Sequence, residues 1–403
     1  MLTEQLLADA RTHAGRIVEL RRAIHAEPEL GLHTPLTLAK VRSELADLPL
    51  EWREGPSTTG AVAILQGSGP GPAVLLRGDM DALPMDEHTG LPFASTIPGR
   101  MHACGHDTHT AMLAGAARIL AQRTGEIAGE VRFMFQPGEE GYHGARFMIE
   151  DGLLGGAGNW PLPDAAFALH IMPNSPHGVI AGRDGAMLAA ADQFEIAVAG
   201  RGGHASMPHD AVDPVPVAAE IVLALQSLVT RRYNAAEATV ITVAQLEAGS
   251  AHNIIPDSAV LKGTIRTLSA DRRAAVQGDI ARLAEGIASA HGCRAEVRIA
   301  EGFPVTVNDA RAVTLGERVA TEMGGAEGWR RLPDPIMGAE DFSYVLEQVP
   351  GAMFFLGVAE EGADWKSCCG IHSSKMMVDE AVLPKGAAFL AACAVRFLDR
   401  GWT

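Results

Sequence analysis

The sequence predicts an α/β fold in which a mainly parallel sheet forms one large domain and a smaller, ferredoxin-like α+β domain is inserted into it. Two observations lead to this prediction. In the first and last parts of the chain, short apolar strands alternate with helices, as in βαβ units around a parallel sheet. In the middle of the chain, the order becomes strand, helix, strand, strand, helix, strand, which is the ferredoxin-like order.

The first part of the chain supplies most of the predicted parallel sheet. Residues 6–24 place leucine and isoleucine near one helical face and predict a single helix. The further elements expected here are strands at 61–65, 73–76, 130–135 and 165–171, and helices at 108–121 and 144–150. Ligands bind beyond the carboxyl ends of parallel strands, so polar residues at those ends are candidates for a functional site.

The middle of the chain predicts a separate unit. Alternating apolar side chains at 192–198 indicate a strand with one buried face. It is followed by a helix at 214–229, strands at 239–246 and 259–267, a helix at 270–291 and a strand at 295–299. The first pattern then resumes with a helix at 309–323, a strand at 352–356 and a helix at 382–398. We therefore expect an inserted domain of residues 187–300 within a discontinuous domain of residues 1–186 and 301–403.

Composition argues against several classes of protein. The 403 residues are 47% hydrophobic and 20% charged, as in an ordinary globular protein. The net charge of −16 argues against nucleic acid and against an anionic membrane as partner. The N-terminus lacks the features of a signal peptide, and the longest apolar run, at 387–395, is well short of the roughly 20 residues that span a bilayer. Five cysteines do not make a disulfide framework, so we expect a reducing, cytoplasmic location.

Histidine occurs 15 times, and one segment concentrates it. Most of these histidines are interpreted as ordinary surface or core residues. Residues 102–109 hold three histidines together with Cys104 and Asp107, at the start of a predicted helix. A cysteine and a histidine two positions apart can face one cation from a non-helical turn, and a thiolate forms readily beside a divalent metal. Chance crowding is the alternative interpretation.

Three strand ends add further ligands for a metal. Asp79 and Asp81 end one strand, Glu139 and Glu140 end another, and His170 lies near the end of a third. All three ends project to the same edge of a parallel sheet. A metal-assisted hydrolase needs one carboxylate to hold a cation and one to take a proton from water. The alternative is that the paired glutamates are solvated residues of a glycine-flanked turn.

The C-terminal part offers one further imidazole, that of His372, shortly before the last helix. For the adjacent Cys368 and Cys369, which lack C-x-x-C spacing, a soft metal ligand, a disulfide and no role at all remain open. Motifs of competing chemistry are absent. The sequence has no G-x-S-x-G elbow, no H-E-x-x-H helix and no Walker lysine, which disfavours a serine nucleophile and nucleotide binding.

Six segments, in order along nearly the whole chain, carry a resemblance to a known family. They are residues 77–84 (RGDMDALP), 101–109 (MHACGHDTH), 136–140 (QPGEE), 202–209 (GGHASMPH), 253–256 (NIIP) and 338–342 (GAEDF). They resemble the aminoacylase and carboxypeptidase family of di-metal hydrolases. Within it, they match the branch of hippurate hydrolases, N-acyl-amino-acid amidohydrolases and plant IAA-amino acid hydrolases.

The resemblance implies a dinuclear metal site. The residues that would hold two divalent metals are Cys104, His106, Glu140, His170 and His372, with the Cys104 thiolate as the bridge. Zinc and manganese are the metals expected, and cobalt suits the same ligands. Glu139 would be the general base that takes a proton from a metal-bridged water and passes it to the departing amine. Asp81 would orient the imidazole of His106.

The inserted block resembles the family's lid and dimerisation domain. His204 is expected to reach an active site, often that of the partner subunit, and to stabilise the tetrahedral oxyanion. Asn253 and Arg266 occupy the places where the family grips the carboxylate of the amino-acid half, a task that suits the fork of arginine. For His204 the alternative interpretation is a histidine in a glycine turn. From the residues alone, Arg266 is preferably interpreted as an ordinary strand-surface arginine. The resemblance implies a homodimer, or a dimer of dimers, formed through this domain.

One departure from the family pattern bears on the substrate. Peptidase members carry a histidine ligand where this chain has Asp79, which places the chain with the acylases. We therefore expect a metal-dependent amidohydrolase that cleaves N-acyl-L-amino acids, small molecules of hippurate-like or aliphatic acyl type, into a carboxylic acid and an amino acid. The alternatives are a dipeptidase or carboxypeptidase of the same fold and a non-catalytic relative that binds acyl-amino acids or metal.

Overall fold

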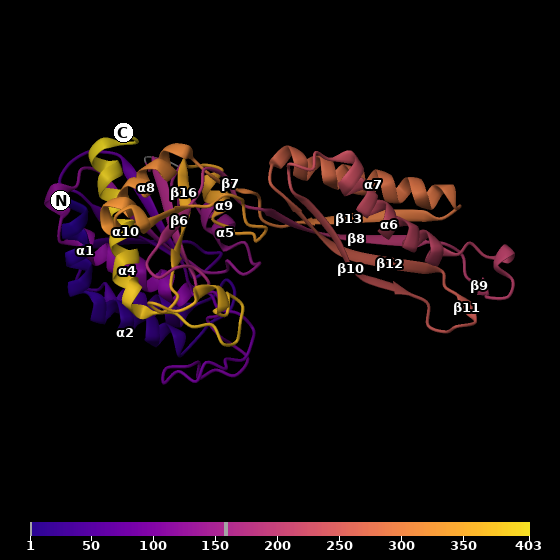
Figure 1. Cartoon of the computed structure of the whole chain (residues 1–403), viewed down its shortest axis with the longest axis horizontal. Coiled ribbons are helices and arrows are strands. Elements are labelled where there is room, and N and C mark those ends of the chain that lie inside the picture. Colours follow the sequence, from indigo (N-terminus) through magenta and orange to yellow (C-terminus); the bar gives the residue numbers. More distant parts are fainter. Residues whose placement is uncertain (1, 157–159) are drawn as a thin grey trace. The chain divides into compact units, whose positions relative to one another are not determined.

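The computed structural model describes residues 2–156 and 160–403, and the chain divides into two units (Figure 1). The larger unit comprises Met1–Met187, Val307–Asp334 and Asp341–Thr403. The inserted unit comprises Leu188–Thr306 and Pro335–Glu340. Each unit has its own apolar core, and the two cores are built from different elements.

The sheet of the larger unit has eight strands in the order β1-β2-β4-β3-β5-β16-β6-β15. Their bounds are β1 Leu50–Glu54, β2 Ala61–Gln66, β3 Ala73–Asp79, β4 Glu130–Gln136, β5 Ala165–Met172, β6 Ile180–Gly182, β15 Trp329–Arg331 and β16 Gly351–Gly357. Strand β3 pairs in parallel with β4 and β5, and β5 pairs in parallel with β16. The predicted mainly parallel central sheet is therefore confirmed, with antiparallel pairing at β1, β2 and β6.

Apolar helices cover this sheet. The helices of the larger unit are α3 Pro35–Glu44, α4 His106–Ala121, α5 Gly144–Glu150, α8 Ala310–Gly324, α9 Ser343–Leu346 and α10 Leu383–Arg400, in addition to the two N-terminal helices. Helices α4 and α10 pack against each other and against β3 and β5. Nearly every residue of α4 is buried, because the helix lies between the sheet, α10 and the N-terminal helices. Helix α8 packs on β16 and β6.

The N-terminal segment forms two helices, α1 Leu2–Thr12 and α2 Ala14–His25, so the prediction of one helix over residues 6–24 is wrong. At His13 the backbone has φ −97° and ψ 2°, and its N–H bonds the carbonyl of Ala10 at 3.1 Å, three residues back instead of four. The two helices then pack on different partners: α1 lies mainly on α10, and α2 mainly on α4. Tertiary packing thus overrides a continuous apolar pattern.

The inserted unit has the predicted ferredoxin-like order. Its elements are β8 Ala190–Ala199, β9 Gly203–His204, α6 Pro214–Arg232, β10 Thr239–Ala248, β11 Ile254–Ile255, β12 Ser258–Thr267, α7 Ala270–Ala290 and β13 Arg294–Glu301. The sheet order is β10-β12-β8-β13 with every pair antiparallel, and α6 and α7 cover one face (Figure 1). Strands β9 and β11 form a separate two-stranded ribbon. Strands β7 Gly185–Leu188 and β14 Thr306–Asn308, most of whose residues belong to the larger unit, form a further two-stranded ribbon.

The inserted unit continues past residue 300, where the sequence places its end. Residues 301–306 stay with this unit because their backbone is tied to β8. The N–H of Gly302 donates to the carboxylate of Asp192 at 3.0 Å, and the carbonyl of Phe303 accepts from the N–H of Ala191 at 3.0 Å. Asp192 is itself buried and pairs with Arg273 at 2.6 Å.

Two helical segments in the described chain, Pro214–Arg232 and Glu380–Arg400, are long and apolar enough to cross a membrane by length and composition. The window in the second is 83% buried within the protein, as expected for a core helix. The first buries one face, with Val217, Ile221 and Leu225, against the sheet of the inserted unit. Buried core helices also meet these criteria of length and composition, so the two helices are only weak evidence for a membrane span.

The packing of α8 on β16 leaves no room for a side chain at Gly316, since a Cβ there would lie 2.3 Å from Cζ of the Phe354 ring. We predict that Gly316→Ala lowers the free energy of unfolding by about 1–3 kcal/mol, because overpacking outweighs the helix propensity that alanine adds. Denaturant unfolding measures the difference. Gly15→Ala in α2 is the matched control, because no heavy atom lies within 4 Å of the added Cβ. Equal losses in both variants would contradict this explanation.

Candidate metal centre

The candidate site lies where β4, β3 and β5 end side by side. Asp79 is the last residue of β3, Glu139 and Glu140 follow β4, and His170 lies near the end of β5. Asp79, Glu139 and His170 are all buried. The parallel pairing of these three strands brings their carboxyl ends to one edge, as the sequence predicts.

A glycine turn brings the cysteine and the first histidine to this edge. Cys104 immediately precedes Gly105, which has φ +86°, and His106 opens α4. A Cβ at Gly105 would lie 2.4 Å from Cγ1 of Ile171. Because the left-handed backbone and the close contact both exclude a side chain, only glycine allows Cys104 and His106 to approach the end of β5 in this way.

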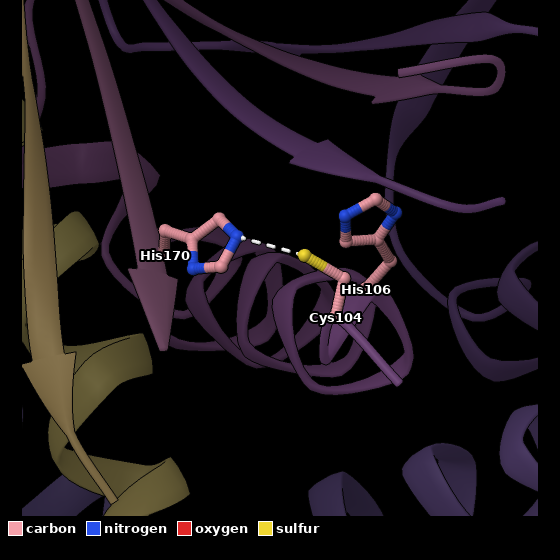
Figure 2. Close-up of side chains that lie close together, drawn as sticks. All are labelled: Cys104, His106 and His170. Atoms are coloured by element: carbon pink, nitrogen blue, oxygen red, sulfur yellow. Dashed lines mark hydrogen bonds between the residues drawn. The ribbon is translucent and has the colours of Figure 1, made fainter. Parts of the chain in front are cut away.

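The predicted ligands form overlapping groups. Figure 2 shows the imidazole of His170 directed at the sulfur of Cys104, with Nε2 and Sγ 3.4 Å apart and His106 beside them. Nε2 of His372 lies 3.3 Å from Oε1 of Glu140. In each of three groups the ligand atoms lie within 4.8 Å of one another: Cys104, His106 and His170; Cys104, Glu140 and His372; and His106, Glu139 and Glu140. Cys104 is common to the first two groups.

Burial and neighbouring charges shift the pKa values of these groups in opposite directions. Burial raises the pKa of the Cys104 thiol and lowers the pKa of His170 well below its ordinary value. Hydrogen bonds to Cys104 and Glu140 raise the pKa of His372 to about 10. Burial alone would lower the pKa of His106, but Asp79 and Cys104 outweigh it and raise that pKa well above its ordinary value. The cluster thus gathers acids and bases that compete for protons in a buried space, an environment typical of a functional site.

The donor set fits divalent cations. Both ring nitrogens of His106 are buried without a hydrogen-bond partner in the described part of the chain. Such atoms are costly unless something binds them. Sulfur, imidazole and carboxylate together suit zinc, manganese or cobalt.

His372 is held at the site in a strained backbone conformation. Its φ is +63°, in the left-handed region that a residue with a side chain rarely adopts. Its N–H donates to the carbonyl of Ala103 at 2.7 Å, which fastens the C-terminal loop to the residue before Cys104. Strain of this kind concentrates at functional sites.

Asp81 contacts more of the site than the sequence indicates. Its Oδ1 lies 3.5 Å from Nδ1 of His106, the contact that the resemblance implies. The same carboxylate also accepts the backbone N–H of Glu139 at 2.9 Å and that of Glu140 at 3.0 Å. Asp81 therefore fixes the turn that carries both glutamates. No sequence signal could have revealed this, because the donors are backbone amides.

A buried ion-pair network adjoins the centre and is absent from the predicted site. Oδ2 of Asp107 accepts from Arg21 at 2.7 Å and lies 2.8 Å from Nδ1 of His25, whose Nε2 lies 3.1 Å from Glu87. Burial alone would lower the pKa of His25, but Asp107 and Glu87 outweigh it and raise that pKa to about 9. Asp107 follows His106 in the chain, so this network holds the start of α4. The sequence signal that could have revealed this network is Asp107, which lies within the histidine-rich segment of residues 102–109.

The three residues predicted in the inserted unit do not all come together within that unit. His204 on β9 pairs with Ile254 on β11, and the N–H of Ala205 donates to the carbonyl of Asn253 at 3.1 Å. His204 and Asn253 are thus neighbours on the exposed ribbon. Arg266 lies near the far end of β12 from Ser258, where that strand begins.

Cys368 and Cys369 take no part in the groups of potential metal ligands that the described residues form. Both thiols are free, as are those of the other three cysteines. Of the three interpretations that the sequence leaves open, the disulfide does not occur in this structure.

The chain resembles known hydrolases over nearly its whole length. Residues 75–396 match the model of peptidase family M20/M25/M40. The thermostable carboxypeptidase 1 of Saccharolobus solfataricus is 39% identical over 99% of this chain and 100% of its own length. The N-acetylcysteine deacetylase of Bacillus subtilis is 37% identical over 98% and 99%, respectively. The IAA-amino acid hydrolase ILR1-like 2 of Arabidopsis thaliana is 38% identical over 95% and 85%.

A solved structure agrees with this comparison. The Bacillus subtilis YXEP protein, described as a dinuclear metal binding peptidase from the M20 family, matches with a TM-score of 0.84 and 33% identity. The match covers 97% of this chain and 99% of that one. The resemblance inferred from the six sequence segments is therefore confirmed.

The network around His25 predicts a pH dependence of stability. The pKa of His25 is about 9 in the folded chain against an ordinary value of 6.5, so its contribution to stability is complete below pH 6.5 and is lost as the pH rises through 9. We predict that His25→Gln lowers the free energy of unfolding by about 3 kcal/mol below pH 6.5 and by much less above pH 9. Denaturant unfolding of the parent and the variant on each side of this pH range measures the difference. His33→Gln, at an exposed histidine, is the control and should show no such dependence.

Proposed function

The chain belongs to peptidase family M20/M25/M40 and is a metallo-amidohydrolase, and from this premise we propose that it cleaves N-acyl-L-amino acids into a carboxylic acid and a free amino acid. The observation that carries the proposal is the position of Cys104. It belongs to two groups of potential metal ligands, and Glu139 lies beside a ligand of the second group.

In this proposal the five predicted ligands hold two divalent cations. Cys104 is shared, His106 and His170 lie with it in one group, and Glu140 and His372 lie with it in the other. When bound, two such cations lower the pKa of water and take up the negative charge that develops on the substrate oxygen. Zinc and manganese are the proposed metals, and the same donors accept cobalt.

Glu139 is the proposed general base. Its side chain is buried, and Oε2 lies 3.9 Å from Nε2 of His106, so the carboxylate faces the ligands. Asp81 fixes its backbone. Glu139 takes a proton from the attacking water as the carbon–oxygen bond forms at the amide carbon. It then passes this proton to the amine nitrogen as the carbon–nitrogen bond breaks.

His204, Asn253 and Arg266 are proposed to bind the substrate from two copies of the chain. Arg266 lies eight residues along β12 from Ser258, a separation of roughly 27 Å at the rise of an antiparallel strand. One small substrate cannot touch both ends of this strand. We therefore propose that a given substrate meets Arg266 from one copy of the chain and His204 and Asn253 from the other.

The surface of the inserted unit supports a homodimer. Strand β10 is an edge strand, and it exposes Val240 and Leu246. The adjacent helix α6 exposes 71% of Leu223. An uncovered edge strand pairs readily with another chain, so a second copy is the natural partner for this face. Two such dimers could assemble further.

Two of the relatives favour acyl-amino acids as substrates, since they are named for N-acetylcysteine and for IAA-amino acids. A carboxypeptidase function is the second candidate, because a relative of that name is 39% identical. Asp79 stands where peptidase members of the family carry a histidine ligand, and this favours the first candidate. Rates on N-acetyl, N-benzoyl and long-chain acyl amino acids, compared with rates on dipeptides, decide between them.

We predict that Glu139→Gln keeps about two metals per chain but lowers kcat by roughly 10²–10⁴-fold, because it removes only the proton acceptor. Metal analysis and assay of the same purified sample measure both. Glu19→Gln, at an exposed glutamate of α2, is the control and should match the parent. A Glu139→Gln variant that retains parental activity with both metals bound would exclude this mechanism, and one without metals would place Glu139 among the ligands.

Sharing of the site between two copies predicts complementation. We expect His204→Ala and Glu139→Gln to be nearly inactive alone. When co-expressed in equal amounts they should recover about a quarter of the parental activity, because half of randomly paired dimers carry one site free of both changes. Co-expression of Cys104→Ala with Glu139→Gln is the control. Both changes affect the same centre, so no site is repaired. Equal recovery in the two mixtures, or none in either, would contradict the shared site.

A further inference from the structure

His109 is not among the predicted ligands, yet both of its ring nitrogens have a partner. It lies in the first turn of α4 and is buried. Nδ1 lies 2.6 Å from Oδ1 of Asp79, and Nε2 accepts the backbone N–H of Ile171 at 2.8 Å. Because an amide nitrogen can only donate, Nε2 carries no proton, and Nδ1 donates its own proton to Asp79. The two contacts therefore define one tautomer.

The backbone of Ile171 is held between two imidazoles. Its N–H is bound by His109, and its carbonyl oxygen lies 2.6 Å from Nδ1 of His170. Because a carbonyl oxygen can only accept, Nδ1 of His170 carries the proton, and its Nε2 has a free lone pair. This is the nitrogen that faces Sγ of Cys104 at 3.4 Å (Figure 2). The same residue thus connects His109 to the direction and tautomer of His170.

Asp79 is fixed at the other end of this chain of contacts. Its Oδ2 accepts from Nη1 of Arg77 at 2.5 Å, and Nη2 of Arg77 donates to Asp341 at 3.0 Å. Both carboxylate oxygens of Asp79 are therefore engaged by protein groups, one with Arg77 and one with His109. Full burial makes such a carboxylate hard to displace from its partners.

Two glycines allow this arrangement. A Cβ at Gly78 would lie 2.8 Å from the carbonyl oxygen of His109, and one at Gly105 would lie 2.4 Å from Cγ1 of Ile171. The first turn of α4 therefore packs tightly against the end of β3 on one side and the end of β5 on the other. His109 is the side chain that joins the two strand ends.

We propose that His109 is a positioning residue for His170. It holds the end of β5 through the N–H of Ile171. This contact directs Nε2 of His170 at the place where a cation would bind beside Cys104. In this proposal Asp79 anchors His109 and is not a metal ligand. The inference rests on the proposed function only in requiring that this centre binds cations.

Two substitutions separate the contacts of His109. In His109→Gln, the amide oxygen can take the place of Nε2 and accept from Ile171. In His109→Asn, the shorter amide can donate to Asp79 but does not reach Ile171. Affinity is measured on the full chain by competition for zinc with a chelator, and the ligand field is read from the absorption spectrum of the cobalt-loaded chain. We expect His109→Asn to lose roughly 10–100-fold in affinity for one of two cations and to change the spectrum, while His109→Gln stays near the parent.

The proposal is overturned if His109→Asn binds both cations with parental affinity and spectrum, or if the two variants lose affinity equally. A second measurement needs no stable variant. In the nitrogen-15 histidine spectrum of the parent, without metal, the ring bound to Asp79 should be protonated at Nδ1 only. A proton on its Nε2 would contradict the proposal.

The cation-binding and nitrogen-15 measurements use no substrate, so they test the role of His109 separately from the proposed hydrolysis. A parent chain that binds two cations but cleaves no acyl-amino acid would contradict the function and leave the role of His109 intact. A parent chain that binds fewer than two cations would contradict the dinuclear centre and this inference together. His33→Gln, at an exposed histidine, controls for the loss of any imidazole.

Discussion

The close contact of the first turn of α4 with the ends of β3 and β5 is the constraint on which the site depends. Gly78 and Gly105 allow this contact, since a Cβ at either position would overlap the neighbouring element. One turn of chain then delivers a thiol and two imidazoles, from Cys104, His106 and His109, to a place where a carboxylate and a further imidazole already end their strands. The close backbone packing at Gly78 and Gly105 therefore determines where the candidate ligands lie.

This packing also buries charge, and the protein offsets it on both sides of His106. Arg77 pairs with Asp79 on the side of β3, and Arg21 pairs with Asp107 on the side of α2. Removing one partner from a buried ion pair leaves a charge that is costly to bury. The arginines therefore keep two carboxylates ionised next to the centre. Those carboxylates in turn orient imidazoles, His109 in one case and His25 in the other.

Much of the fold, and the gathering of the candidate ligands at one edge of the sheet, could be predicted because both follow from local pattern. Apolar runs identified the central strands, and the rule for parallel strands brought Glu139, Glu140 and His170 to one edge. What could not be predicted depends on backbone atoms or on distant packing. The turn at His13 reflects the different partners of α1 and α2. The amides that Asp81 accepts and the amide that His109 accepts leave no trace in the residue types. The short strands β6 and β15 carry too few residues for a periodic pattern.

The order of elements along the chain has a consequence for how the protein is made. Strand β5 carries His170 and is synthesised early, whereas its parallel neighbour β16 and the loop with His372 follow the entire inserted unit. Domains generally fold as units while the chain is still growing. The inserted unit is therefore complete on the ribosome before the larger unit can close its sheet. His372 is the last of the five candidate ligands to be synthesised, so the complete set exists only after the inserted unit has been made.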